Sequence, residues 1–139
     1  MPARWDVTLA VAGGGALGAA TRYALTEAWP PAAGGFPWVT FAINVSGCLL
    51  IGALMVYLLE VLPPGRYARP FLAVGVLGGF TTFSTYAGET ETLLRHGPAP
   101  VALGYLFGTL VAALLATWAG TALARLAAGF THPGHGRTR

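Results

Sequence analysis

The sequence predicts an all-α integral membrane protein, a four-helix bundle in one domain. Of its 139 residues, 55% are hydrophobic and only 9% are charged, and the mean hydropathy is +0.62. Soluble domains contain about 25% charged residues, so this composition indicates that lipid surrounds most of the chain. The charged residues also stand far apart and leave four apolar runs of about 20 residues, the length a helix needs to cross a bilayer.

Proline and glycine set the limits of the first two spans, which we expect at 7–28 and 36–62. The first run ends at Trp29-Pro30-Pro31 and the second at Pro63-Pro64-Gly65. Proline has no amide donor and disfavours helix in the residue before it, so both helices are expected to end there.

The third and fourth spans are expected at 70–95 and 100–128, and each opens with a proline, which a helix start tolerates. The remaining tail, 129–139, is predicted to be disordered. The four spans would then form a single membrane domain, 1–139, with no soluble domain.

The middle of the third span is predicted to break. Gly78 and Gly79 each weaken a helix by about 1 kcal/mol relative to alanine, and the hydroxyls of Thr81 and Thr82 compete for backbone hydrogen bonds. Inside a bilayer, non-helical backbone survives only where protein or water satisfies it. Transporters use such carbonyls to bind Na⁺, so we expect functional backbone in this stretch.

Polar residues inside spans point to function, because hydrocarbon offers them no partner. In the second span, Thr40, Asn44 and Gly47 follow i, i+4, i+7 spacing and share one face. In the fourth span, Tyr105 and Thr109 are four residues apart. Hydrogen bonds between neighbouring helices are the alternative explanation, since they are common for such side chains in membrane bundles.

Two glycine pairs predict close helix packing. Gly14 with Gly18, and Gly104 with Gly108, have the spacing that lets another backbone approach closely. Such pairs are frequent in membrane helices, so they indicate tight association and say nothing about a solute.

Aromatic and hydroxyl side chains follow the expected break. Phe83 and Tyr86 are three residues apart and present two rings on one face, beside Thr82, Ser84 and Thr85. Ring edges are electropositive, so rings, hydroxyls and an amide can attract an anion without a full cation that would trap it. Ordinary packing is the alternative for an aromatic pair at this spacing.

Arg22 lies inside the first span, where a guanidinium is costly unless it pairs or snorkels. One interpretation is a snorkelling side chain or a partner for Glu27. The other is a positive vestibule that attracts anions, or a hydrogen bond to carbonyls at an interface between subunits.

Arginine is enriched on one side of the predicted bundle, which favours both termini in the cytoplasm. Only Arg95 falls on the opposite side, and Arg22 lies within a span. The arginines on the amino-terminal side are Arg4, Arg66, Arg69, Arg125, Arg137 and Arg139.

Three ordered motifs resemble one known family. They are Gly13-Gly14-Gly15 through Arg22-Tyr23, the stretch 40–47 around Asn44, and the stretch 78–86. On these residues the chain resembles the Fluc (CrcB) fluoride channels, over nearly its whole length. The resemblance implies passive export of cytoplasmic fluoride, and so fluoride resistance, by a multi-pass protein of the inner (plasma) membrane.

The resemblance further implies an antiparallel homodimer with two pores, each lined by both subunits. The same chain would then insert in both orientations, a dual topology. Because the arginine distribution is uneven, pairing with an oppositely oriented homologue is the alternative.

Site residues follow from the same resemblance. The implied fluoride pore consists of Asn44, Phe83, Tyr86, Thr40, Ser84, Thr85, Tyr105 and Thr109. Arg22 is assigned to a vestibule or the interface, and the main-chain carbonyls of Gly78 and Thr81 would hold a structural Na⁺ between the subunits. The chain departs from the family pattern at Tyr86, where phenylalanine is usual, and at Thr109, where serine is frequent.

Other classes fit the residues less well. A small four-span proton-coupled multidrug exporter needs a membrane-embedded carboxylate in an early span, and Glu27 lies too near the end of its span. An assembly subunit without transport would not need the polar cluster. The arginines form no basic stripe with interleaved aromatics, which disfavours nucleic acid, and the hydroxyls lack a histidine base within the spans, so no enzyme is predicted.

Overall fold

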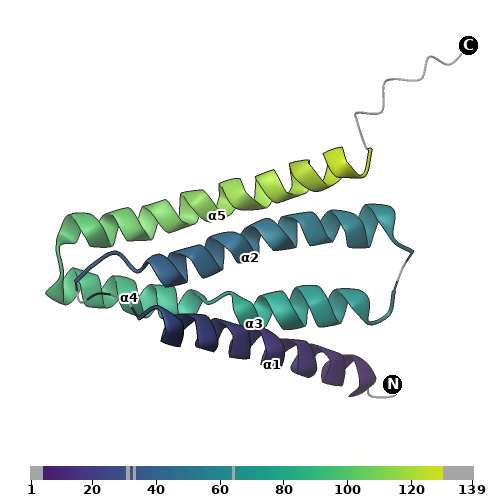
Figure 1. The fold of residues 1–139 in the computed structure, drawn as a ribbon, viewed down its shortest axis with the longest axis horizontal. Coiled ribbons are helices and arrows are strands. Elements are labelled where there is room, and N and C mark those ends of the chain that lie inside the picture. Colours follow the sequence, from purple (N-terminus) through teal and green to yellow (C-terminus); the bar gives the residue numbers. More distant parts are fainter. Residues whose placement is uncertain (1–4, 31, 33, 64, 130–139) are drawn as a thin grey trace, which may run out of the picture.

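The computed structural model describes residues 5–30, 32, 34–63 and 65–129, so the predicted tail after Gly129 lies outside the described residues. Within this part every regular element is helical, as predicted (Figure 1). The elements in chain order are α1 (Trp5–Ala28), α2 (Trp38–Val56), η1 (Tyr57–Val61), η2 (Arg69–Leu77), α3 (Gly78–Phe80), α4 (Phe83–His96) and α5 (Ala99–Ala127). The two η elements are wider π-helices that continue their neighbours, so η1 prolongs α2 and η2 leads into α3.

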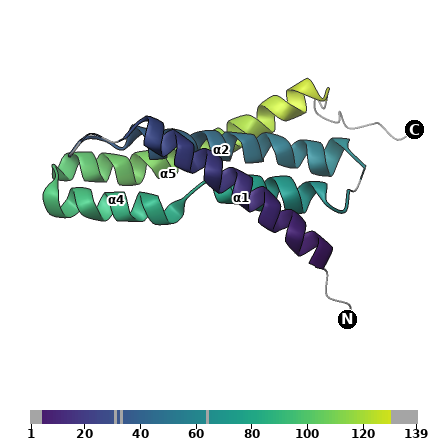
Figure 2. The ribbon, with the colours of Figure 1, turned by 60° about the horizontal axis from the view of Figure 1, so that its bottom comes forward.

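The helices pack as two pairs. The α2 and α5 helices lie side by side along most of their length, and α1 crosses η2 and α3 obliquely (Figures 1 and 2). The α4 helix packs against α5. The start of α1 and the end of α5 lie at the same end of the bundle (Figure 1).

Glycine allows α1 to touch the backbone of η2 and α3. A Cβ atom on Gly14 would collide with the Phe71 carbonyl, and one on Gly18 would collide with the Val76 carbonyl. The predicted close packing of this glycine pair is therefore confirmed. By contrast, Gly104 and Gly108 on α5 have no atom of the described chain within 4 Å of an added Cβ. This second pair therefore faces no other helix of the described residues.

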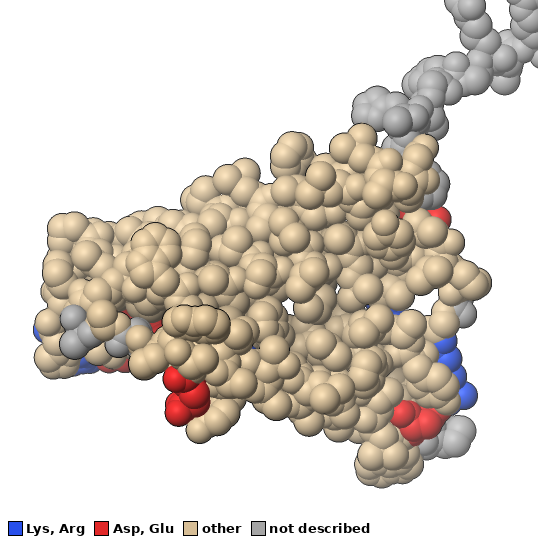
Figure 3. Space-filling view, in the orientation of Figure 1, with Lys and Arg blue, Asp and Glu red and all other residues tan. Residues whose placement is uncertain are grey.

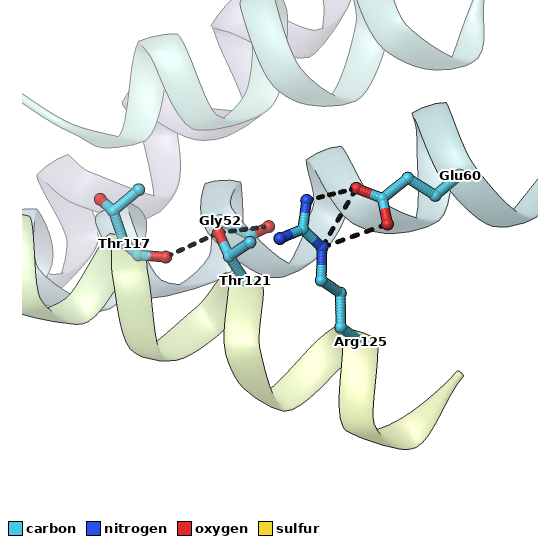
Figure 4. A network of polar contacts seen from close by, with 5 residues as sticks. All are labelled: Gly52, Glu60, Thr117, Thr121 and Arg125. Atoms are coloured by element: carbon cyan, nitrogen blue, oxygen red, sulfur yellow. Dashed lines mark hydrogen bonds and ion pairs between the residues drawn. The ribbon is translucent and has the colours of Figure 1, made fainter. Parts of the chain in front are cut away.

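A second glycine crossing joins α2 to α5. Cβ atoms on Gly52 and Gly120 would collide with the Thr117 and Leu49 carbonyls of the facing helix. The Thr121 hydroxyl donates to the Gly52 carbonyl at 3.4 Å and to the Thr117 carbonyl of its own helix (Figure 4). One helical turn further on, Arg125 of α5 forms a 2.7 Å ion pair with Glu60 of η1. Together these contacts hold α5 against α2 at the end where the chain starts.

Few charged residues interrupt the face drawn in Figure 3, and many large hydrophobic side chains of the described chain are exposed. Three helical stretches of the described chain are long and apolar enough to cross a membrane, namely Trp38–Val61, Arg69–His96 and Ala99–Ala127. The α1 helix has 24 residues but includes Asp6, Arg22 and Glu27, and it is not one of the three.

Candidate functional site

Two threonines separate α3 from α4. Thr81 (φ −75°, ψ 154°) and Thr82 (φ −145°, ψ 117°) are extended, whereas Gly78 (φ −64°, ψ −34°) is still helical. The departure from helix thus lies at the two threonines of the expected break, whereas Gly78 remains helical. The glycines have another use, because a Cβ on Gly79 would collide with the Gly15 carbonyl of α1.

Asn44 pairs with the main chain of Thr82. Its Nδ2 donates to the Thr82 carbonyl at 3.0 Å, and its Oδ1 accepts from the Thr82 amide at 2.8 Å. One side chain from α2 therefore satisfies both backbone groups of a residue that has left the helix. Since an amide nitrogen carries two hydrogens, one N–H of Asn44 remains for another acceptor.

Two carbonyls lose their usual helical donors at this point. In an unbroken helix the Gly78 carbonyl would accept from the amide of Thr82, and the Thr81 carbonyl from that of Thr85. The Thr82 amide instead bonds to Asn44, and the Thr85 amide bonds at 3.1 Å to the Thr82 hydroxyl, which caps α4. The carbonyls of Gly78 and Thr81 thus lack these partners, and carbonyl oxygens are ligands that hard cations accept.

Arg22 bonds to the same segment. Its Nε donates to the Gly79 carbonyl at 3.2 Å. Within the described chain it forms no ion pair with Glu27. Of the interpretations open from the sequence, the carbonyl hydrogen bond is the one this structure contains, although its acceptor belongs to the same chain.

A cavity of about 190 Å³ opens beside the interruption. It is bounded by α2, the Thr81-Thr82 segment, α4 and α5. The lining residues are Asn44, Thr81, Thr82, Phe83, Tyr86, Thr109, Leu110 and Ala113. The rings of Phe83 and Tyr86 lie 5.7 Å apart and tilted at 54°, but Phe83 is 75% exposed and Tyr86 only 4%. Phe83 therefore forms an open edge of the cavity.

The hydroxyl of Thr109 is buried in this wall and makes no hydrogen bond within the described chain. Leaving a buried hydroxyl unpaired costs about 1–3 kcal/mol. The unpaired Thr109 hydroxyl therefore indicates a hydrogen-bond partner from outside the chain. Among the groups that line the cavity, Thr109 and the spare N–H of Asn44 are donors, and no lining residue is charged. The arrangement suits a small anion.

Tyr86 turns its hydroxyl away from the cavity. The hydroxyl donates to the Leu106 carbonyl of α5 at 2.5 Å, which ties α4 to α5. The ring itself remains in the wall and contacts Tyr105 at 5.2 Å between centroids. The ring of Tyr86 thus stays in the cavity wall while its hydroxyl bonds to the neighbouring helix.

A carboxylate that we did not single out from the sequence joins two of the predicted residues. Glu89 accepts from the Thr40 hydroxyl at 2.8 Å through Oε1 and from the Tyr105 hydroxyl at 2.6 Å through Oε2. Thr40 is 2% exposed and Tyr105 is fully buried. Glu89 also borders a cavity of about 490 Å³ with Thr85 and Thr92, so this cluster lies between the buried tyrosine and an open pocket.

The predicted residues thus fall into two groups linked by aromatic rings. Asn44, Phe83, Tyr86 and Thr109 line the smaller cavity, while Thr40 and Tyr105 meet at Glu89. Thr85 lies beside the larger pocket, and its hydroxyl accepts from Thr82. Ser84 is exposed, with its hydroxyl 3.3 Å from that of Thr82 and outside both cavities.

Comparison with known proteins gives the family. Residues 9–121 match the family model of the CrcB-like protein, Camphor Resistance (CrcB). The chain belongs to the CrcB-like family. The fluoride-specific ion channel FluC 1 of Streptomyces coelicolor is 54% identical over 81% of this chain and 73% of its own length. FluC 3 of Streptomyces avermitilis is 53% identical over 89% of this chain and 61% of its own, and FluC 2 of Nocardia farcinica is 51% identical over 88% of each.

Membership of the CrcB-like family confirms the resemblance seen in the three motifs. Together with the three stretches able to cross a bilayer, it identifies the chain as a multi-pass membrane protein. These relatives are named as ion channels, a class without enzymatic chemistry. The roles of the individual site residues, the dimer and the bound Na⁺ remain predictions.

Proposed function

We propose that this chain is a subunit of a fluoride-selective channel of the inner membrane, which lets cytoplasmic fluoride leave passively. The observation that carries the proposal is the unpaired Thr109 hydroxyl, buried in the wall of an uncharged cavity between two aromatic rings and the Asn44 amide. The names of the relatives in the CrcB-like family point to the same ion.

The chemistry of the cavity favours an anion that can leave again. Fluoride is a strong hydrogen-bond acceptor that loses its hydration shell on entering a narrow site, so it needs donors in return. Thr109 and Asn44 supply hydroxyl and amide donors, and the edges of Phe83 and Tyr86 add partial positive charge. Because no guanidinium or ammonium lines the cavity, binding stays weak enough for conduction.

From the cavity the proposed path continues towards Glu89. The rings of Tyr86 and Tyr105 are in contact, and the Tyr105 and Thr40 hydroxyls are both held by the Glu89 carboxylate. A fluoride ion arriving here would have to take over one of these hydroxyls from the carboxylate. Beyond Glu89 the larger pocket, with Thr85 and Thr92 in its wall, provides a wide mouth.

We propose that two copies of the chain complete the pores. Phe83 is 75% exposed although it borders the cavity, so one chain encloses the cavity on only part of its circumference. The spare glycine pair, Gly104 and Gly108, leaves room on α5 for another backbone. An antiparallel second copy is the preferred partner, with dual topology of the one chain, and an oppositely oriented homologue is the alternative.

A structural Na⁺ fits the carbonyls at the interruption. Gly78 and Thr81 have carbonyls deprived of their helical donors, and a second copy related by a two-fold axis would bring the same pair again. The ion would supply positive charge that holds these oxygens together at the interface. Arg22, bonded to the neighbouring Gly79 carbonyl, fixes the segment from the α1 side.

The deciding experiment is ion efflux from liposomes that contain the purified protein. Vesicles loaded with fluoride should lose it rapidly when a potassium ionophore balances charge, and vesicles loaded with chloride should retain it. The variant Thr109→Val should slow fluoride efflux, whereas Thr117→Val, on the same helix but bonded to its own Ala113 carbonyl, should not. Absence of fluoride efflux, or equal efflux of chloride, would contradict the proposal.

A further inference from the structure

The Tyr86 hydroxyl donates to the Leu106 carbonyl, which lies within reach of the Thr109 hydroxyl. A carbonyl oxygen has two lone pairs, and within α5 the Leu106 carbonyl already accepts the amide four residues ahead. The 2.5 Å bond from Tyr86 takes the second lone pair. The Leu106 carbonyl is therefore saturated by one bond from its own helix and one from α4.

Helical threonines in this chain ordinarily bond to their own helix. Among the described residues, the helical donors to the carbonyl four residues earlier are Thr21, Thr26, Thr90, Thr92, Thr117 and Thr121, and Thr81, directly after α3, does the same. Ser46 instead uses the carbonyl three residues earlier. A hydroxyl in a helix can thus reach two carbonyls, and for Thr109 these belong to Tyr105 and Leu106.

Thr109 makes neither bond, and its hydroxyl is unpaired in the cavity wall. We propose that Tyr86 is a positioning residue for Thr109: by filling the Leu106 carbonyl, it closes one of the two internal acceptors and keeps the Thr109 hydroxyl available to the ion. This inference rests on the proposed fluoride pathway. Tyrosine in place of phenylalanine therefore does not add a donor to the path but preserves one.

The test is a double-mutant cycle between Tyr86 and Thr109. The variant Tyr86→Phe keeps the ring and frees the Leu106 carbonyl, which Thr109 can then use. The fluoride concentration that half-saturates efflux should rise about two- to tenfold, the factor that one hydrogen bond of ordinary net strength contributes. In a Thr109→Val background, where no hydroxyl is left to divert, the same Tyr86→Phe change should have no further effect.

A purely structural role would give a different result. If Tyr86 only locks α4 to α5, its substitution changes efflux by the same factor with or without the Thr109 hydroxyl, and this additivity would overturn the proposal. An unchanged half-saturating concentration in Tyr86→Phe alone would overturn it as well. Thr117→Val is the matched background, because the Thr117 hydroxyl already bonds to its own helix and Thr117 does not line the cavity; there the full effect of Tyr86→Phe should persist.

A structure of the Tyr86→Phe variant gives a readout that does not depend on transport. We expect the Thr109 Oγ1 atom to turn to within hydrogen-bond distance of the Leu106 carbonyl. A Thr109 side chain that stays unpaired in that variant would overturn the positioning role, even if the protein conducts fluoride. Conversely, a protein that moves no fluoride but shows the turned Thr109 would contradict the proposed function alone.

Discussion

The side-chain amide of Asn44 on α2 forms hydrogen bonds with both main-chain groups of Thr82, 38 residues further along the chain. In doing so it replaces the two bonds that a helix would have given Thr82. An interruption at membrane depth is expensive unless its backbone groups are satisfied. Asn44 thus stabilises the local backbone in addition to lining the cavity.

Replacing Asn44 with alanine should therefore damage both stability and transport. The change leaves the Thr82 amide and carbonyl without partners, at about 1–3 kcal/mol for each buried group. We expect a lower thermal unfolding midpoint in detergent and fluoride efflux reduced at least tenfold. Ser46→Ala, on the same helix and bonded only to Ile43, is the control that should change neither measurement. Normal stability in Asn44→Ala would refute the backbone role.

The glycine crossing between α1 and α3 should not tolerate a methyl group. In Gly18→Ala the added atom meets the Val76 carbonyl and the Phe80 amide, both of them rigid backbone, so the helices must separate. Overpacking of this kind costs about 1–3 kcal/mol, which should appear as a lower midpoint of thermal unfolding. Gly13→Ala is the matched control on α1, since nothing lies within 4 Å of its added Cβ. Equal midpoints for the two variants would contradict this packing.

Removing the Tyr105 hydroxyl should slow fluoride efflux. Tyr105 is fully buried, and its hydroxyl is one of two donors to Glu89, so Tyr105→Phe takes a donor from the proposed path without changing the ring. We expect efflux from liposomes to fall about tenfold, the order of one charge-assisted hydrogen bond. Tyr57→Phe, at an exposed position, should conduct like the unmodified protein. Unaltered efflux in Tyr105→Phe would remove this residue from the path.

The start of α1 should loosen in acid. A hydrogen bond from Tyr67, with Arg66 close by, holds the pKa of the Asp6 carboxyl below its ordinary value. A depressed folded-state pKa means that the ion pair stabilises the fold above the unfolded pKa, about 3.9, and that this contribution disappears as the pH falls through the folded value. Hydrogen exchange at residues 7–10, compared at pH 6 and pH 3, should speed up relative to the intrinsic rate.

Asp6→Asn is the control for the acid effect. Because this side chain does not titrate, exchange at residues 7–10 relative to the intrinsic rate should be the same at pH 6 and pH 3. If the variant loosens in acid as much as the unmodified protein, another group is responsible for the change.

The helices could be predicted from the sequence because lipid leaves so few alternatives. An apolar run between prolines must satisfy its own backbone, and a helix does this locally. The interruption lies at Thr81 and Thr82, within the expected stretch, but the glycines before it are helical for a tertiary reason. Gly79 is used for contact with Gly15, and whether a glycine serves flexibility or close approach depends on what faces it.

The polar cluster at Glu89 is not apparent from local sequence patterns. Thr40 lies 49 residues before Glu89 and Tyr105 lies 16 after it, so no local pattern joins the three. The available signal was a carboxylate inside the expected third span, 70–95, since ionisable groups at that depth mark functional sites. The direction of the Tyr86 hydroxyl had no such signal, because it depends on how α4 packs on α5.

The threonines that bond within their own helices have a consequence for estimating how polar a membrane protein's interior is. Among the described residues, seven threonine hydroxyls donate to a carbonyl one turn back, so their hydrogens are not available to a passing anion. A path between such helices offers hydrogen-bond donors to an ion only where a hydroxyl does not bond to its own helix. The other interfaces between the helices would then exclude ions because they contain few free donors.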